Sequence, residues 1–247
     1  MEALVVEHAA ALIVGNELLS GKVAEANLVE LARTLRPLGV RLARASMLPD
    51  ELPVLTREIR ALSQDYPLVF TSGGVGPTHD DITIDAVAAA FGVKSVEHPT
   101  LAELIRRAYG ERCTPAHLRM ALVPEGAELA LSPSGAWPTP VFHNVWMLPG
   151  VPEVFREKLD TIRAWVRGPS PFVSLAVYTK LDEPSLKLLI DKSVETHPDV
   201  EVGSYPRWFE PSYKTKITFD ARDRAAVERA AREFVASLPE GALVRVE

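Results

Sequence analysis

The sequence predicts an α/β protein that has a three-layer α/β/α domain with a mostly parallel sheet, followed by a small α+β domain. Two observations support this prediction. Strand-like apolar runs alternate with helical patterns through residues 1–168, as is typical of a parallel sheet covered on both faces. A stiff linker, Gly168-Pro169-Ser170-Pro171, then precedes residues 172–247, where the order becomes strand-helix-strand-strand-helix-strand, as in ferredoxin-like modules.

Local patterns define the elements of the first domain. Apolar runs predict strands over 10–14, 40–48, 68–70 and 145–148. Asn27 is expected to cap a helix that ends before Gly39, and Pro53 to open one that turns Leu55, Ile59 and Leu62 inward. Further helices are expected over 84–91, after a Thr100/Glu103 capping box, over 114–122 and over 152–167.

The same reasoning defines the second domain. Strands are expected over 172–180, 200–204, 214–219 and 243–246, and helices over 184–196 and 223–238.

Composition limits the classes of partner. Acidic residues outnumber basic ones, 33 to 27, so neither nucleic acid nor a membrane is expected as a partner. The single Cys113 rules out an internal disulfide and fits a reducing compartment. The N-terminal residues resemble neither a signal peptide nor a spanning helix, so we expect a cytoplasmic protein.

The run from Thr71 to Thr83, TSGGVGPTHDDIT, is the most informative segment. An apolar strand leads into a glycine turn, whose N–H groups can approach an oxyanion, and then into a helix near Ile84. Asp80 and Asp81 would repel a phosphate unless a cation lies between them, so the run suggests a metal-bridged phosphorylated ligand. The alternative is an ordinary turn with Asp81 or Thr83 as the helix cap.

Known glycine motifs do not explain this run. It lacks the third glycine of a dinucleotide-binding fingerprint and the Gly-Lys-Ser/Thr of a P-loop. Two other predicted strands also end at glycine, at Gly15 and Gly150. Because the carboxyl ends of parallel strands form ligand crevices, we expect these two turns and Gly73 to meet in one crevice.

These motifs together resemble a known family. The glycine run, the earlier GNELLSG of residues 15–21 and NVWMLPGVP of residues 144–152 are similar to the MoaB/MogA molybdopterin-binding fold in its CinA-type branch. The resemblance extends to the second domain, where DEPS of residues 182–185 and GSYP of residues 203–206 are similar to FAD synthases. Two segments depart from the family pattern: Glu25-Ala26-Asn27 replaces Asp-Thr-Asn, and residues 134–140 replace a Gly-Thr-Ala-Pro-Gly segment.

The resemblance implies functions for individual residues. It places Asp81 at the phosphate of a pterin ligand and makes Asp50 a second functional carboxylate. In CinA-type and FAD-synthase-type members, the pocket is linked to metal-dependent hydrolysis of a nucleotide pyrophosphate of the FAD or ADP-ribose class. The alternative is a non-hydrolytic molybdopterin-binding protein that serves molybdenum cofactor biosynthesis.

The expected site therefore contains acids and ligand-binding groups. Asp81, Asp80 and Asp50 are the candidate catalytic residues, and Asp81, Asp50 and Glu17 would hold Mg, Mn or Co. The residues expected to contact the small phosphorylated ligand are Gly15, Asn16, Asn27, Gly73, Gly74, Gly76, Pro77, Thr78, Thr83, Pro149 and Gly150. Asp50 is equally explained as a turn residue and Asn27 as a helix cap. We also expect a homo-oligomer.

Overall fold

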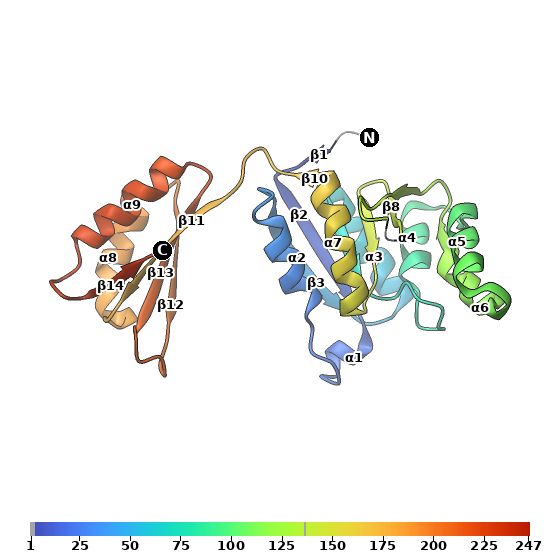
Figure 1. Cartoon of the computed structure of the whole chain (residues 1–247), viewed down its shortest axis with the longest axis horizontal. Helices are drawn as coiled ribbons and strands as arrows, with labels where there is room; N and C mark the ends of the chain where they lie inside the picture. The colour runs from blue at the N-terminus through green and yellow to red at the C-terminus, as the bar shows by residue number, and fades with distance from the viewer. Residues whose placement is uncertain (1–2, 136) are drawn as a thin grey trace. The chain divides into compact units, whose positions relative to one another are not determined.

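The computed structural model describes residues 3–135 and 137–247, and it divides into two compact units, Met1–Pro169 and Ser170–Glu247 (Figure 1). Each unit has its own sheet and its own hydrophobic core.

A six-stranded sheet forms the centre of the N-terminal unit. Its order is β3-β2-β4-β9-β8-β7, in which the first four strands run parallel and β8 and β7 are antiparallel (Figure 1). The strands are β2 (His8–Val14), β3 (Arg41–Leu48), β4 (Val69–Ser72), β7 (Glu128–Ala130), β8 (Thr139–Phe142) and β9 (Val145–Leu148). The carboxyl ends of β2, β4 and β9 therefore lie at one edge of the sheet, as the sequence predicts.

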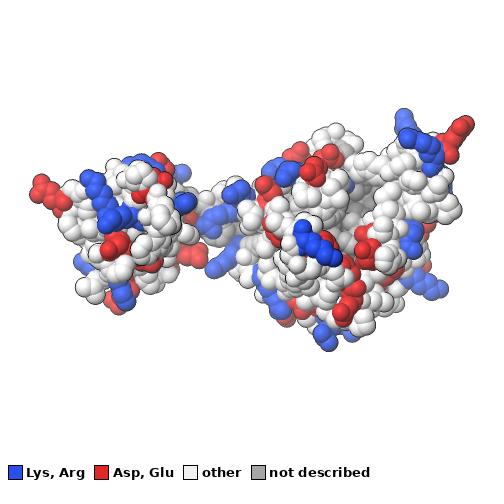
Figure 2. Space-filling model, turned by 90° about the horizontal axis from the view of Figure 1, so that it is seen from below, with Lys and Arg blue, Asp and Glu red and all other residues white. Residues whose placement is uncertain are grey.

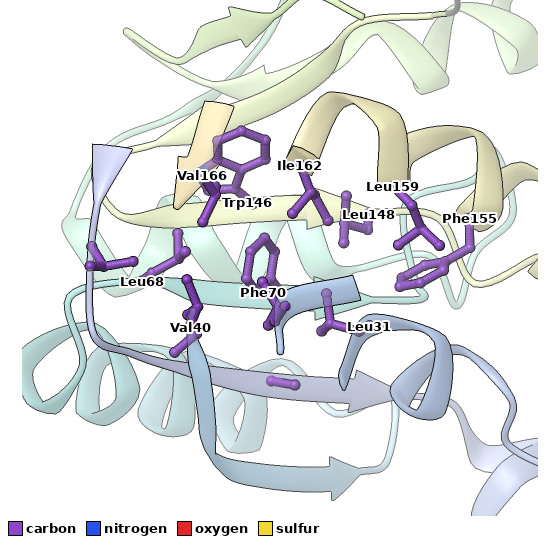
Figure 3. Packing of buried hydrophobic residues seen from close by; sticks show 14 of the residues in the cluster. Leu31, Val40, Leu68, Phe70, Trp146, Leu148, Phe155, Leu159, Ile162 and Val166 are labelled. Carbon is purple, nitrogen blue, oxygen red and sulfur yellow. The ribbon is translucent and has the colours of Figure 1, made fainter. Parts of the chain in front are cut away.

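Helices cover both faces of this sheet. On one face, α2 (Asn27–Leu35) and α7 (Pro152–Trp165) pack Leu31 and Phe155 against Phe70 and Trp146 of the sheet (Figure 3). On the other face lie α3 (Leu52–Asp65) and α4 (Thr83–Phe91). The predicted inward residues of α3, namely Leu55, Ile59 and Leu62, are all fully buried.

A smaller subdomain extends the unit. It contains β5 (Ser95–Glu97), α5 (Pro99–Tyr109), η1 (Gly110–Arg112), α6 (Pro115–Leu118), η2 (Arg119–Ala121) and β6 (Leu122–Pro124). β5 and β6 pair with each other, and Leu101, Ile105 and Val123 form a separate small core. A short pair, β1 (Leu4–Val5) and β10 (Val166–Arg167), joins the two ends of the unit.

The C-terminal unit has the predicted ferredoxin-like order. Its elements are β11 (Val173–Thr179), α8 (Glu183–Thr196), β12 (Glu201–Pro206), β13 (Thr215–Ala221), α9 (Arg224–Ala236) and β14 (Leu243–Val246). The sheet order is β12-β13-β11-β14 with every pair antiparallel, and residues such as Leu186 and Phe234 of the two helices form the core with Phe219. The predicted fold class is confirmed for both units.

Two predicted helix caps are wrong. Helix α2 begins at Asn27 with Ala26 as its N-cap, because the longer Glu25 side chain reaches the Leu28 N–H at 2.7 Å and takes over the capping. The capping box predicted at Thr100 and Glu103 is absent, because helix α5 starts two residues earlier, with His98 as its N-cap accepting from the Thr100 N–H at 3.2 Å.

Charged residues of both signs are interspersed over the face of each unit shown in Figure 2. Among the described helices, none has the length and apolar character required to cross a membrane.

Candidate functional site

An open cleft of about 430 Å³ lies where β2, β4 and β9 end. It brings together all three glycine turns that the sequence places at one crevice, at Gly15, Gly73 and Gly150. The predicted site residues that line the cleft are Gly15, Glu17, Asp50, Gly73, Gly74, Gly76, Thr78, Asp80, Asp81, Pro149 and Gly150. Pro77, Asn16, Asn27 and Thr83 do not line it.

Glycine at position 73 is required by close backbone packing. Gly73 has φ 103°, and a Cβ there would overlap the carbonyl oxygen of Val14, while a Cβ on Gly150 would lie 3.1 Å from the Gly73 Cα. The Gly73 N–H donates to the Leu148 carbonyl at 3.2 Å, so it is not the free anion donor that the sequence suggests. Within the described residues, the N–H groups of Gly74 and Gly76 make no hydrogen bond and remain available to a ligand.

The turn is closed by Thr78 and the two aspartates. The Thr78 N–H donates to Asp81 Oδ2 at 2.8 Å, and the Thr78 hydroxyl lies 2.5 Å from the same oxygen and 2.6 Å from Asp80 Oδ1. This hydroxyl hydrogen bond lowers the pKa of the Asp80 carboxyl below its ordinary value, which favours the ionised form. One hydroxyl hydrogen serves two carboxylates, which leaves negative charge for a cation to neutralise.

Asp50 and Glu17 also line the cleft. Asp50 Oδ2 accepts from the Asn16 N–H at 2.8 Å and so fixes the start of the short helix α1 (Asn16–Leu19). The Glu17 carboxylate folds back over Gly15, where a Cβ would come within 2.8 Å of Oε2. Asp50 thus has a structural contact and a place in the cleft at once.

Thr83 and Asn27 support the cleft from beneath. Thr83 is fully buried; its N–H donates to the Gly74 carbonyl at 2.9 Å and its hydroxyl to the Gly73 carbonyl at 2.8 Å. The alternative in which Asp81 or Thr83 caps α4 is wrong, since Ile82 is the N-cap. Asn27 donates to Ser72 Oγ at 3.0 Å and to the Gly150 carbonyl at 2.8 Å, which ties α2 to the ends of β4 and β9.

The acids of the cleft have the chemistry that a hard divalent cation requires. Carboxylate oxygens suit Mg²⁺ and Mn²⁺, and Mg²⁺ is usually held by one or two carboxylates with the remaining positions taken by water and phosphate oxygens. Among the described residues, no group of three or more His, Cys, Asp or Glu side chains is arranged to hold a metal by itself. The donor set therefore fits an ion shared with a bound phosphate rather than an all-protein site.

A second cavity, of about 350 Å³, adjoins the cleft and contains a residue that sequence reasoning missed. Val75 and Pro149 line both spaces. Lys158 of α7 lines the apolar cavity, and its side chain is 6% exposed. Burial lowers the pKa of the Lys158 ammonium to about 8. The sequence pattern could have indicated this residue, because Lys158 lies on the same buried face of α7 as Phe155, Leu159 and Ile162.

The altered segment at 134–140 forms part of this second cavity. Trp137, Pro138 and Pro140 line it, while Ala136 lies outside the described residues. The departure from the family pattern thus changes the apolar cavity rather than the glycine turn.

The parallel sheet, the glycine turn and the acidic cleft define an α/β domain of the kind that binds small ligands at the carboxyl ends of its strands. The chain belongs to the family described as "Probable molybdopterin binding domain", whose model matches residues 10–167. Residues 171–247 match the family described as "FAD synthase, middle domain".

Individual relatives agree with this assignment. A protein of Archaeoglobus fulgidus is 30% identical over 222 residues, which cover 90% of this chain and 93% of the relative. The "Probable FAD synthase" of Caenorhabditis elegans is 30% identical over 89% of this chain, which spans only 48% of that relative. The crystal structure of the protein CinA, of unknown function, from Thermoplasma acidophilum is 29% identical with a TM-score of 0.58, and covers 64% of this chain and 96% of that chain.

Proposed function

We propose that the protein is a divalent-metal-dependent hydrolase of a nucleotide pyrophosphate of the FAD or ADP-ribose class. The observation that carries the proposal is the meeting of two unpaired backbone donors, Gly74 and Gly76, with Asp80 and Asp81 on one cleft. Donors alone would suit any anion, but the adjacent acids favour a phosphate that arrives with a cation. Similarity to FAD synthase and CinA-like proteins supports the same ligand class.

Each residue has a role in such a reaction. The N–H groups of Gly74 and Gly76 hold phosphoryl oxygens, and Asp81 with Asp80 or Asp50 would hold the ion. That ion would neutralise the phosphoryl charge and lower the pKa of a bound water. Asp80, whose ionised form the Thr78 hydroxyl stabilises, would accept a proton from the attacking water. Water then adds to one phosphorus as its bond to the bridging oxygen breaks, which gives two monophosphates, one of them AMP.

The test is release of AMP. The full chain is incubated with FAD, ADP-ribose or NAD, each with magnesium, manganese, cobalt or a chelator, and AMP is measured by chromatography. We expect AMP from at least one dinucleotide and only in the presence of a metal. Absence of AMP in every combination would overturn the proposal.

Substitution of Asp81 separates chemistry from folding. Asp81→Asn should lower the rate of AMP release by roughly 100-fold or more, because it removes an anionic group from the reacting centre. Asp160→Asn is the matched control, since Asp160 is an exposed acid of α7 that pairs with Arg163 and does not line the cleft. Equal rates for Asp81→Asn and wild type would contradict the assignment.

Non-hydrolytic binding of a molybdopterin remains the alternative use of the same pocket. Calorimetry with a pterin phosphate and with ADP-ribose distinguishes them. Tight binding of the pterin alone, without AMP release from any dinucleotide, would favour the alternative.

A further inference from the structure

The cavity beside the cleft is built for an apolar, uncharged group. Its wall is formed mainly by aliphatic, aromatic and proline side chains, among them Leu101, Met120, Trp137 and Met147. Its volume of about 350 Å³ lies within the range of small-ligand pockets. Such a wall favours a flat ring system over a phosphate or a sugar, which would lose hydration there.

One cationic side chain interrupts this apolar wall. Lys158 Nζ donates to the backbone carbonyls of Trp137, at 2.5 Å, and of Pro138, at 3.1 Å. An ammonium group has three donors. Among the described residues its hydrogen bonds go only to these two carbonyls, and the Glu157 carboxylate acts on it through its charge, without a hydrogen bond. The buried ammonium is therefore incompletely satisfied.

The fold uses Lys158 to bind the carbonyls of Trp137 and Pro138, but it supplies no protein acceptor for the third N–H of the ammonium. A methionine of similar length would avoid the desolvation that lowers the pKa of Lys158, but it would leave those two carbonyls without this donor. Groups that are costly to the fold and lie in a pocket are candidates for a functional role. An acceptor on a ligand in the cavity can take this remaining N–H.

The cavity and the acidic cleft form neighbouring parts of one site. Val75 lies in the glycine turn and Pro149 follows β9, and each lines both spaces. A ligand whose phosphate lies at Gly74 and Gly76 can therefore place an attached ring against Met147 and Lys158.

We propose that this cavity binds a flat heterocycle that bears a carbonyl oxygen, and that Lys158 donates its third hydrogen bond to that oxygen. The proposal rests on the proposed function for the phosphate half of the ligand. It selects a ring such as a flavin, which presents carbonyl acceptors, over adenine, which presents no carbonyl. Lys158 is thus a residue that determines specificity and takes no part in bond cleavage.

The experiment compares FMN with AMP as probes. Both carry one phosphate on a nucleoside-like group, and neither contains a pyrophosphate, so binding is measured whether or not the protein hydrolyses dinucleotides. Calorimetric titrations use the full chain with magnesium, as wild type and as Lys158→Met. We expect Lys158→Met to weaken FMN binding by about tenfold to a hundredfold, which is the usual loss for one hydrogen bond from a charged donor, with AMP binding changed less than about twofold.

Controls make each outcome decisive. Lys94→Met removes an exposed lysine of the same unit and should leave both affinities unchanged. Unchanged AMP binding by Lys158→Met shows that the variant is folded and that its cleft is intact. The proposal is overturned if wild type does not bind FMN, if Lys158→Met binds FMN as tightly as wild type, or if the variant loses AMP affinity to the same extent as FMN affinity.

Discussion

The acidic cleft and the apolar cavity beside it share Val75 and Pro149, yet they are built in opposite ways. The cleft is made of backbone and short polar side chains that follow three strand ends, and its Asp80 and Asp81 carboxylates receive hydrogen bonds from the nearby Thr78. The cavity is lined mainly by apolar side chains, and its one charged group, Lys158, is a buried ammonium.

The two regions therefore depend on different physical requirements for stability. The cleft depends on steric conditions, because only glycine permits the approach of β4 to β2 and β9. The cavity depends on an electrostatic condition, because Lys158 is held away from water. A substitution at Gly73 should therefore change stability at every pH, whereas a substitution at Lys158 should change it in a way that depends on pH.

The largest effect is expected for Gly73→Ala. The new Cβ would overlap the Val14 carbonyl oxygen at a backbone φ of 103°, so β2 and β4 would have to separate. We expect a loss of about 3–4 kcal/mol in the free energy of unfolding, measured by urea denaturation.

Gly92→Ala provides the matched control. Gly92 also has positive φ, at 74°, but a Cβ there meets no atom within 4 Å. It should cost only about 1 kcal/mol. Equal losses for the two variants would show that backbone conformation, and not close packing of the strand ends, requires Gly73.

Lys158→Met should change the stability of the protein in a pH-dependent way, because it removes a buried titratable group. The folded-state pKa of about 8 lies below the ordinary value of 10.5, so the unfolded chain binds more protons between these values and the wild type becomes more stable as pH rises. Below pH 8 the cost of burying the charge is fully present. The stability of wild type relative to Lys158→Met should therefore increase by roughly 2–3 kcal/mol from pH 7 to pH 10.

Urea denaturation of both proteins at the two pH values measures this change, and the difference between them cancels the titration of other groups. A constant difference across this range would mean that Lys158 is not desolvated in the folded protein.

The same contrast explains what the sequence could predict. Strands such as Val145–Leu148 and the buried face of α3 were predicted because local periodicity reports burial. The short strands β5 to β8 were not predicted, since three or four residues give too little pattern and their pairing is decided by tertiary contacts. The glycine turn is local and was found, whereas the cavity exists only once distant elements pack.

Local signals also misled at particular residues. Asparagine is a residue type that favours helix caps, but the Asn27 amide donates instead to Ser72 Oγ and to the Gly150 carbonyl. The Glu25 carboxylate accepts from the Leu28 N–H at the start of the helix. The glycine pattern predicts that the Gly73 N–H binds an anion, but this N–H donates to the Leu148 carbonyl at the end of β9. In both cases a long-range hydrogen bond replaced the local one.

Asn27→Ala should therefore lower both the stability of the protein and its affinity for ligand by an intermediate amount. It leaves the Gly150 carbonyl and the Ser72 hydroxyl without this donor, which we expect to cost about 1–2 kcal/mol of stability and to weaken ADP-ribose binding measured by calorimetry. Asn144→Ala is the control, because Asn144 bridges Ser63 and Tyr66 away from the cleft. A similar loss of affinity in both variants would show only a general loss of stability.

The smallest effect is expected for Thr78→Val, and it tests the electrostatics of the cleft alone. The substitution removes the hydroxyl that lowers the pKa of Asp80 but keeps the Thr78 backbone N–H that binds Asp81. The pKa of Asp80 should rise toward its ordinary value, so that the carboxylate is lost at a higher pH as the solution is acidified. Carboxyl carbon NMR titration measures this, with Asp182, whose pKa is lowered by Ser185 in the other unit, as an internal control. If the pKa of Asp80 stays low in the variant while that of Asp182 is unchanged, another group must stabilise the Asp80 carboxylate, and the pairing of both acids around one hydroxyl would no longer be the reason for placing a cation there.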